Sequence, residues 1–322
     1  MNLPGPIPLG EIRAAAERIR GFAVRTPALR LNADATDRDV EIYLKLENLQ
    51  PIGSFKIRGA SNAMALAPRE ALARGVYTAS AGNMAQGVAY SARRLGVPCA
   101  VIVPEHAPEA KLAAISRLGG KIEKLPFDRW WQVLVDHGTA GREEFFVHPV
   151  SDPAVIAGNG TIGLEILEEV PDADAILVPY GGGGLSCGIA SAVRALKPDV
   201  RVYGCEADTA APLSASLAAG APRDISYTPS FVDGIGARGL LAEMWPLVRE
   251  LLSGSIVSSL SEIAAAVKLV AERNRVVAEG AAGAAVAAAL SGRVRGKKIV
   301  CVVSGGNIDS AKLAKILNGE IP

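Results

Sequence analysis

The sequence has 322 residues, of which 49% are hydrophobic, and its 34 basic and 33 acidic residues leave a net charge of +1. The length favours two domains, and the balanced charge excludes the basic surface that nucleic-acid-binding and membrane-surface proteins present. No run reaches the roughly 18 apolar residues that a membrane-spanning helix needs, so we expect no membrane span.

Short β-branched runs alternate along the chain with segments of helical pattern. The first helix is expected over Glu11–Gly21, which repeats apolar residues at helical spacing and ends at a glycine. Further helices are expected over Ala85–Leu95, from Ser261 onward, and in the Ala-rich segment Val276–Leu290. The expected strands are Val76–Ala79, Ala100–Val103, Ala175–Pro179, Val200–Cys205 and Lys298–Val303. This alternation predicts an α/β fold with a mostly parallel sheet covered by helices.

The cysteines and histidines give no sign of a disulfide framework or a zinc site. Cys99, Cys187, Cys205 and Cys301 lie in apolar or glycine-rich surroundings without CxxC spacing. We therefore expect buried free thiols and a reducing compartment. The first ten residues also lack the basic start and apolar run of a signal peptide, so a cytoplasmic location is expected.

A run of glycines, Gly181, Gly182, Gly183 and Gly184, follows the expected strand Ala175–Pro179 and precedes a helix of small residues. Ligands of open α/β sheets bind where strands end and helices begin. Successive glycine N–H groups at such a junction can converge on an anion. The run lacks the Lys-Ser/Thr of a nucleotide P-loop and the GxGxxG pattern. It predicts a phosphate cup that is not built for a triphosphate; a flexible surface turn is the alternative.

Lys56 lies between Phe55 and Ile57 in a stretch of small residues. Most lysines are solvated surface residues, and this remains the alternative interpretation. A lysine in apolar surroundings, however, loses its proton more easily and can act as a nucleophile or form an imine. A lysine and a phosphate cup on one sheet are what pyridoxal phosphate needs.

Four sequence blocks resemble, in order and spacing, the signature motifs of the serine/threonine dehydratase and serine racemase family, which are fold-type II pyridoxal-phosphate enzymes. The blocks are Ser54–Ala60, Ser80–Gly87, Gly181–Gly184 and Ser304–Asn307. The resemblance extends over nearly the whole chain. It implies two open, twisted, mostly parallel sheets with flanking helices. It also implies a large cofactor-binding domain of residues 1–49 and 149–322, a small domain of residues 50–148 that closes over the active site, and a homodimer.

The resemblance also implies roles for the residues around the cofactor. Lys56 would hold pyridoxal phosphate as a Schiff base and later remove the α-proton of the substrate. Phe55 would pack against the cofactor ring, Asn83 would bond its hydroxyl group, and Ser304, followed by Gly305, would meet its nitrogen. Glu279 would line the cofactor pocket, and the phosphate would be held by Gly181, Gly182, Gly183 and Gly184.

The implied reaction is β-elimination from a small β-hydroxy amino acid such as L-threonine or L-serine, which yields a 2-oxo acid and ammonia. Ser80 is the second catalytic candidate beside Lys56. The substrate carboxylate would lie at a helix N-terminus formed by Ser80, Ala81, Gly82, Asn83 and Met84.

Some residues depart from the family pattern. Racemases of the family carry a second serine where this chain has Ala81, and a methyl group cannot relay a proton, so elimination is favoured and racemisation is the alternative. Met84, Tyr180 and the pair Trp130-Trp131 are also unusual. Core packing is one interpretation of them. The other is an enlarged pocket for a bulkier hydroxyamino acid such as phenylserine.

A divalent cation is doubtful. Glu206 matches a glutamate that binds metal in several relatives, but Pro212 stands where the companion aspartate is expected. The alternative interpretation is that Glu206 is solvated or caps a helix.

The sequence also bears on three other classes of protein. A β-replacement synthase would share the fold but usually has a different lysine block. A non-catalytic cofactor-binding protein would not need Lys56, Asn83 and Ser304 together, and a nucleotide-binding protein is disfavoured by the missing P-loop lysine.

Overall fold

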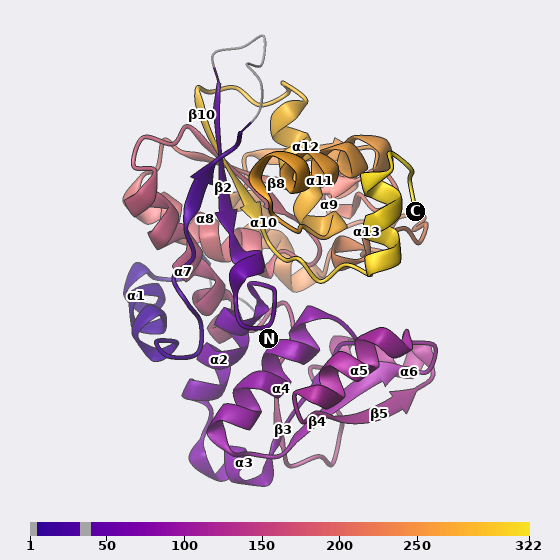
Figure 1. Cartoon of the computed structure of the whole chain (residues 1–322). Coiled ribbons are helices and arrows are strands. Elements are labelled where there is room, and N and C mark those ends of the chain that lie inside the picture. Colours follow the sequence, from indigo (N-terminus) through magenta and orange to yellow (C-terminus); the bar gives the residue numbers. More distant parts are fainter. Residues whose placement is uncertain (1–4, 33–39) are drawn as a thin grey trace.

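The computed structural model describes residues 5–32 and 40–322, and the parts of the expected large domain at 1–4 and 33–39 lie outside the described residues. In the described part, the strands form two sheets, each flanked by helices, and the two sheets lie one above the other in Figure 1. This arrangement confirms the predicted α/β fold with two mostly parallel sheets.

The larger sheet has the strand order β1-β2-β10-β7-β8-β9. Its described strands pair in parallel except for β1, which runs antiparallel to β2. Their bounds are β1 Ala28–Arg30, β2 Glu41–Leu46, β7 Ala175–Pro179, β8 Arg201–Ala207, β9 Gly254–Ser258 and β10 Lys298–Val303.

The larger sheet is buried on both faces, which explains the continuous apolar runs of its central strands. In β10, Ile299, Cys301 and Val303 point into one hydrophobic core, whereas Val300 and Val302 point into the core on the opposite face. Side chains of a strand alternate between its faces, so each central strand contributes to both cores.

Helices and short 3-10 turns surround this sheet. Helices α11 and α12 contribute to the core on one face, and α1, α7, α8 and α10 to the core on the other. The bounds are α1 Leu9–Arg18, η1 Glu47–Leu49, α7 Pro153–Glu169, α8 Gly184–Leu196, α9 Pro212–Ala219, η2 Asp233–Ile235, η3 Ala242–Met244, α10 Trp245–Leu251, α11 Leu260–Asn274, α12 Gly280–Leu290 and α13 Ser310–Leu317.

The smaller sheet is formed by residues 76–146 and has the all-parallel order β5-β4-β3-β6. Its strands are β3 Val76–Ala79, β4 Cys99–Pro104, β5 Lys121–Leu125 and β6 Phe145–Phe146. The helices of this part are α2 Lys56–Leu66, α3 Arg69–Arg74, α4 Asn83–Leu95, α5 Glu109–Arg117 and α6 Phe127–Val135.

Several helix boundaries differ from the predicted ones, and a capping interaction explains the first of these differences. Helix α11 begins after Ser259 rather than Ser261, because Ser259 and Glu262 form a reciprocal capping box. Helix α1 ends at Arg18, before Gly21. Helix α12 begins only at Gly280, so the segment from Val276 to Glu279 is not helical. The predicted end of α4 is confirmed, since Gly96 adopts the left-handed conformation with φ of 70°.

All four cysteines of the sequence lie in the described part, and they are buried and free, which confirms the prediction. Among the described residues, no helix is both long enough and apolar enough to cross a membrane.

Glycines let helices α2, α7 and α8 approach one another closely. A Cβ atom on Gly158 of α7 would overlap the carbonyl oxygen of Arg58 in α2, and one on Gly188 of α8 would overlap that of Ile156 in α7. At these glycines the backbones therefore pack in direct contact, and α2 lies beside α7 (Figure 1).

We predict that Gly188→Ala lowers the free energy of unfolding by about 1–3 kcal/mol, the usual cost of overpacking a core. Gly10→Ala in α1 is the matched control, because a Cβ atom there meets nothing within 4 Å. The control should leave stability unchanged or raise it by up to about 1 kcal/mol. Chemical denaturation of both variants measures this, and equal stabilities would contradict close packing at Gly188.

Candidate active site

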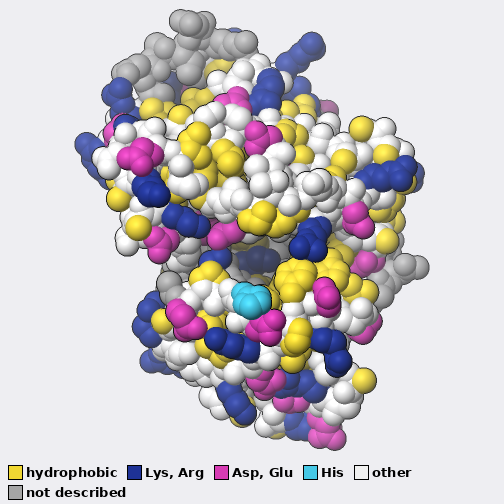
Figure 2. All heavy atoms as spheres, turned by 90° about the vertical axis from the view of Figure 1, so that its right-hand side faces the viewer, with side chains coloured by type: hydrophobic (Ala, Val, Ile, Leu, Met, Phe, Trp, Pro, Cys, Tyr) yellow, Lys and Arg dark blue, Asp and Glu magenta, His cyan; other side chains and the backbone are white. Residues whose placement is uncertain are grey.

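The residues of the predicted site lie at the ends of strands from both sheets. The loop after β3 carries Ser80–Asn83, the loop after β7 carries the glycine run, and the loop after β10 carries Ser304–Asn307. The segment before Lys56 joins this last loop, since Phe55 N donates to Ser304 O at 3.0 Å and Gly306 N donates to Gly53 O at 2.9 Å. Figure 2 shows that the face between the two sheets is hollowed there, with basic side chains in the hollow and a hydrophobic patch at its rim.

Lys56 is the first residue of α2, and its amine is held inside the protein. Its Nζ atom donates to the carbonyl oxygen of Pro149 at 2.9 Å and lies 5.3 Å from the centre of the Phe55 ring. Burial lowers the pKa of Lys56 to about 8, although the Glu279 carboxylate acts to raise it. The amine therefore loses its proton near neutral pH, as a nucleophile or base requires.

The carbonyl group that receives Lys56 belongs to a tight turn built on His148. The Nδ1 atom of His148 accepts from Val150 N at 3.2 Å and from Ser151 N at 2.9 Å. Burial lowers the pKa of His148 to about 4, so this imidazole stays neutral and keeps its acceptor. The turn thus fixes Pro149, and with it the position of the Lys56 amine.

The glycine run forms a cradle at the N-terminus of α8. Gly183 has φ of 94°, and a Cβ atom on Gly182 would lie 2.6 Å from Cγ1 of Val150. Gly184 likewise packs on the Val150 carbonyl group. Only glycines fit between Val150 and the helix, and their N–H groups at the positive end of the α8 dipole suit an anion.

Asn83, Glu279 and Asn307 form a chain of hydrogen bonds across the site. Asn83 Nδ2 donates to both carboxylate oxygens of Glu279, at 3.0 and 3.2 Å, and Asn83 Oδ1 accepts from Asn307 Nδ2 at 2.8 Å. Asn307 also donates to Ile52 O at 2.8 Å. The amide of Asn83 is therefore held in one orientation by residues from two distant loops.

The Glu279 carboxylate is almost fully buried against the glycines of two loops. A Cβ atom on Gly305 would lie 2.8 Å from its Oε1 atom, and one on Gly234 would lie 3.2 Å from it. Burial raises the pKa of Glu279 to about 7, although the hydrogen bond from Asn83 acts to lower it. Nearby, Lys111 and Asp233 form an ion pair at 2.8 Å that connects the two parts of the molecule.

The loop after β3 offers a second anion cradle. Ser80 Oγ accepts from Gly82 N at 3.2 Å, and Gly82 is the residue before the first turn of α4. The first N–H groups of a helix have no partners within the helix. The loop that carries Ser80, Ala81 and Asn83 can therefore receive a carboxylate at the N-terminus of α4.

These features fit pyridoxal phosphate. The Lys56 amine, whose pKa is lowered, suits the aldehyde group of the cofactor. The glycine run, which has no room for Cβ atoms at Gly182 and Gly184, suits its phosphate group. The Asn83 amide is fixed on Glu279, and Ser304 lies beside Lys56, since its backbone oxygen accepts from Phe55 N. The structure thus brings together Phe55, Lys56, Ser80, Asn83, Gly181–Gly184, Glu279, Ser304 and Gly305 at facing loops.

The unusual residues lie mostly in cores. Met84 is 2% exposed within the core of the smaller sheet, and Tyr180 is fully buried in a core of the larger sheet. Trp130 packs against the core on one face of the smaller sheet, and Trp131 is 37% exposed. Core packing therefore accounts for Met84, Tyr180 and Trp130.

Glu206 caps a helix. Its buried carboxylate accepts from Leu213 N at 2.7 Å and Ser214 N at 2.9 Å, in the first turn of α9, and from Ser255 Oγ at 2.6 Å. The suggestion that Glu206 is solvated is wrong, and its lone pairs are engaged. Among the described residues, no group of His, Cys, Asp and Glu side chains is arranged to hold a metal ion.

Sequence reasoning missed three contributors to the site. Asn307 lies in the Ser304–Asn307 block, but no role was predicted for it, although its position just after Ser304 indicated that it lies near the site. The Pro149 contact is made by a backbone oxygen, which every residue has, so the residue type gives no signal for it. Lys111 was one of 34 basic residues, and its pairing with Asp233 spans 122 positions.

Comparison with known proteins agrees with this geometry. Residues 19–305 match the family model described as pyridoxal-phosphate dependent enzyme. The chain is 42% identical to an L-threonine ammonia-lyase of Geobacter sulfurreducens, over 97% of this chain and 78% of that protein. It is 36% identical to the catabolic L-threonine dehydratase of Escherichia coli, over 97% and 96% of the two chains. The structure of maize serine racemase superposes with a TM-score of 0.87 and 33% identity, over 98% of each chain.

We predict that Lys56 in the cofactor-free protein reacts with an amine-specific reagent with a midpoint near pH 8, because burial disfavours its charged form. Glu279→Gln removes a charge that stabilises the ammonium ion, so the midpoint should move to lower pH. Peptide mass spectrometry across a pH series measures both, and labelling of the exposed Lys197 normalises the reagent. A midpoint near 10.5, the ordinary lysine value, would contradict the prediction.

Proposed function

The chain belongs to the family of pyridoxal-phosphate-dependent enzymes, and we propose that it is an ammonia-lyase acting on a small β-hydroxy amino acid. The reaction removes the β-hydroxyl and amino groups of L-threonine or L-serine and leaves a 2-oxo acid and ammonia. The observation that carries the proposal is the buried amine of Lys56, with its lowered pKa of about 8, at the meeting point of the phosphate and carboxylate cradles.

Pyridoxal phosphate, when bound, supplies an aldehyde for the amino group of the substrate and withdraws electrons from its α-carbon. The glycine run Gly181–Gly184 would hold the phosphate through backbone N–H groups at the N-terminus of α8. Asn83, fixed by Glu279 and Asn307, would orient the ring hydroxyl group, and Phe55 would pack on the ring.

Lys56 performs the proton transfer. Near neutral pH its amine is partly uncharged because of its burial, so Nζ can accept the α-proton. The hydrogen bond to Pro149 O keeps Nζ in place. The N-terminus of α4, with Ser80, would bind the substrate carboxylate and thereby orient the α-hydrogen toward Lys56.

Racemisation is the second candidate, since the structure of maize serine racemase is similar to this chain. A racemase must also deliver a proton from the face opposite Lys56. Ala81 stands at the position where racemases of the family carry a serine, and a methyl group cannot deliver a proton. This residue favours elimination.

We also propose that residues 50–148 act as a small domain that closes over the site. The closing contacts would include the Lys111–Asp233 ion pair and Arg238, whose guanidinium lies 4.9 Å from the centre of the Phe127 ring. Assembly as a homodimer is proposed from the family resemblance. The four free, buried cysteines support a reducing compartment such as the cytoplasm.

We predict that L-threonine and L-serine release 2-oxo acid and ammonia, and that phenylserine has a lower kcat/KM, because Met84 and Tyr180 lie in cores. Lys56→Ala should lower kcat at least about 100-fold, the usual contribution of a positioned acid or base. Lys197→Ala, at an exposed lysine, is the control and should retain activity. A preference for phenylserine would instead support the enlarged pocket, and full activity of Lys56→Ala would refute the proposed function.

We predict that the wild-type protein forms D-serine from L-serine much more slowly than it forms pyruvate. Ala81→Ser introduces a hydroxyl group and should raise the ratio of racemisation to elimination, because a proton can then reach the second face. Chiral chromatography beside an oxo-acid assay gives this ratio. Wild-type racemisation that rivals elimination would overturn the assignment as a lyase.

A further inference from the structure

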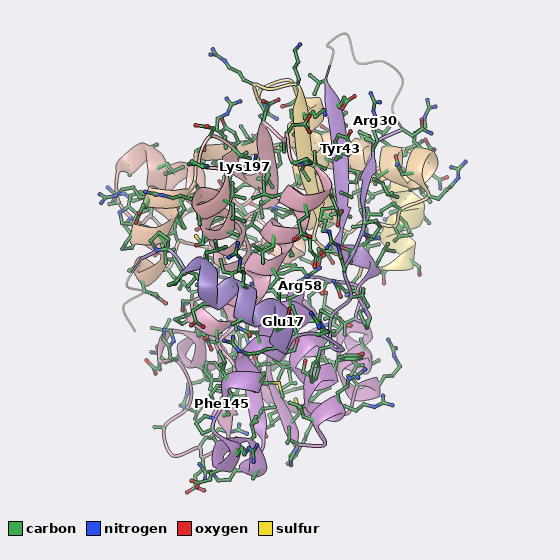
Figure 3. The ribbon with its side chains drawn as sticks, turned by 90° about the vertical axis from the view of Figure 1, so that its left-hand side faces the viewer. Glu17, Arg30, Tyr43, Arg58, Phe145 and Lys197 are labelled. Atoms are coloured by element: carbon green, nitrogen blue, oxygen red, sulfur yellow. The ribbon has the colours of Figure 1, made fainter. Side chains whose placement is uncertain are left out.

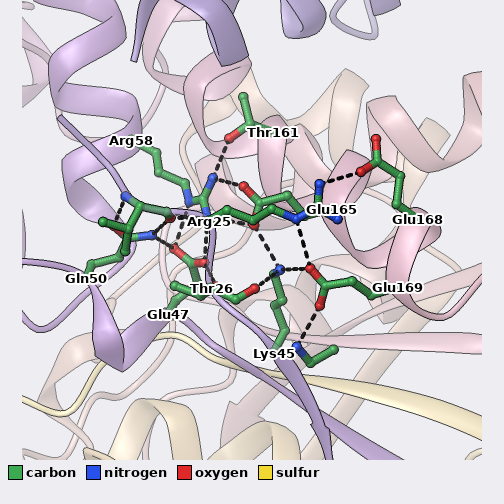
Figure 4. A network of polar contacts seen from close by, with 12 residues as sticks. Arg25, Thr26, Lys45, Glu47, Gln50, Arg58, Thr161, Glu165, Glu168 and Glu169 are labelled. Carbon is green, nitrogen blue, oxygen red and sulfur yellow. Dashed lines mark hydrogen bonds and ion pairs between the residues drawn. The ribbon is translucent and has the colours of Figure 1, made fainter. Parts of the chain in front are cut away.

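A cluster of charged and polar side chains, buried at its centre and exposed at Arg25 and Glu168, lies behind α2, away from the residues assigned to the reaction. Figure 4 shows its members and the bonds between them. We call it the Arg58 network, and it comprises Arg25, Thr26, Lys45, Glu47, Gln50, Arg58, Thr161, Glu165, Glu168 and Glu169.

Arg58 is the centre of this network. Its Nε and Nη2 atoms donate to the two oxygens of Glu47, each at 2.8 Å. Its Nη1 and Nη2 atoms donate to the two oxygens of Glu165 at 2.6 and 2.9 Å. Thr161 Oγ1 accepts a further bond from Nη1 at 3.0 Å. The planar guanidinium fork thus forms paired bonds to both oxygens of each carboxylate, a geometry that a lysine ammonium group lacks.

Charges of opposite sign pair inside the network. Arg58 is 1% exposed, and Lys45, which is fully buried, pairs with Glu165 at 2.8 Å and with Glu169 at 3.0 Å. Burial alone would raise the pKa of Glu165, but the charges of Arg58 and Lys45 hold it below its usual value. Burial would likewise lower the pKa of Arg58, and the two carboxylates hold it above its usual value. Arg58 and Glu165 therefore each favour the charged form of the other.

Arg58 and Lys56 point to different sides of α2. Residues two apart on an α-helix are separated by about 200° around its axis. Lys56 reaches the Pro149 carbonyl group, whereas Arg58 reaches Glu47 and Glu165. Figure 3 shows Arg58 in the interior, at the junction between the two parts of the molecule. Arg58 therefore has no contact with the reacting groups and acts on them only through the helix.

The partners of Arg58 all come from the part of the chain that carries the larger sheet. Glu47 lies in η1, and Thr161 and Glu165 lie in α7. The first turn of α2 also packs directly on α7, since a Cβ atom on Gly59 would lie 2.7 Å from Val155. Although α2 precedes the strands of the smaller sheet, its first turn is bound to the body that holds the glycine run.

We propose that Arg58 is a positioning residue, whose paired bonds to Glu47 and Glu165 fix the first turn of α2, and with it Lys56, to the part of the protein that carries the phosphate-binding glycines. The proposal rests on the proposed function, because it assumes that Lys56 is the cofactor-bearing base. In this arrangement the first turn of α2 stays with the larger part although it falls within residues 50–148, so the distance from Lys56 to the glycine run stays constant while the smaller sheet, residues 76–146, moves.

The network acts by geometry rather than by its charge at the amine. The pKa of Lys56 is set by burial and by Glu279, and no member of the network is among its causes. A change at Arg58 that preserves the charge should therefore still disturb catalysis if it loosens the helix.

The test is Arg58→Lys, which keeps the charge but loses the fork, with Arg142→Lys as matched control. Arg142 also bridges two carboxylates, Glu123 at 2.7 Å and Glu144 at 2.8 Å, but it lies beside the smaller sheet. We expect kcat of the holoenzyme to fall about 100-fold in Arg58→Lys, as for a small misplacement of a reacting group, with KM changing much less. Hydrogen exchange of residues 56–60 should accelerate with and without cofactor, and the control should change neither quantity.

The proposal would be overturned if Arg58→Lys kept the wild-type kcat and the wild-type rate of hydrogen exchange at α2. This holds even if the thermal stability of Arg58→Lys fell as much as that of the control variant. If Arg58→Lys does not fold, Glu165→Gln, which keeps shape and removes one pair, is measured in the same way with the same expectation. A wild-type holoenzyme without the visible absorbance of a lysine-linked cofactor would refute the proposed function instead. Hydrogen exchange at α2 would still decide the role of Arg58.

Discussion

The contact between α2 and α7 is the constraint on which the site depends. Gly158 and Gly59 bring the two helix backbones together, and Arg58 ties the same turn to Glu165. The turn before α7 supplies the Pro149 oxygen that receives Lys56, and Val150 shapes the glycine run at the start of α8. One packed interface thus sets the amine and the phosphate cradle relative to each other, while the loops after β3 and β10 add Asn83 and Ser304.

Two buried groups of opposite type titrate close to neutral pH in this site. The pKa of Lys56 falls to about 8 and that of Glu279 rises to about 7, and burial is the main cause in both cases. The Glu279 carboxylate acts to raise the pKa of Lys56, and the hydrogen bond from Asn83 acts to lower the pKa of Glu279, so both groups resist the full effect of burial. Asn83 lies between Glu279 and Asn307, and its orientation therefore depends on the same carboxylate that influences the base.

The sequence was most informative where a local pattern carries the chemistry. The glycine run, the block around Lys56 and the strand-helix alternation are local, and the structure has them where they were expected. The cap of α11 was also readable, because Ser259 and Glu262 have capping-box spacing and Ser261 does not. Contacts between distant residues were not readable. Helix capping by Glu206 was one of the interpretations, and its partners lie only 7 and 8 positions away, whereas nothing near Arg58 points to Glu165, which lies 107 positions away.

The long separations have a consequence for how the protein matures. Lys56 meets Pro149 across 93 positions, so its amine acquires its surroundings only after the chain has been synthesised through α7 and α7 has docked on α2. Contacts of this kind form late because distant segments must first be brought together. A partly folded chain would therefore present an ordinary solvated lysine instead of the activated one. Pyridoxal phosphate can therefore bind at Lys56 only after this part of the chain has folded, and its binding then stabilises the folded state by mass action.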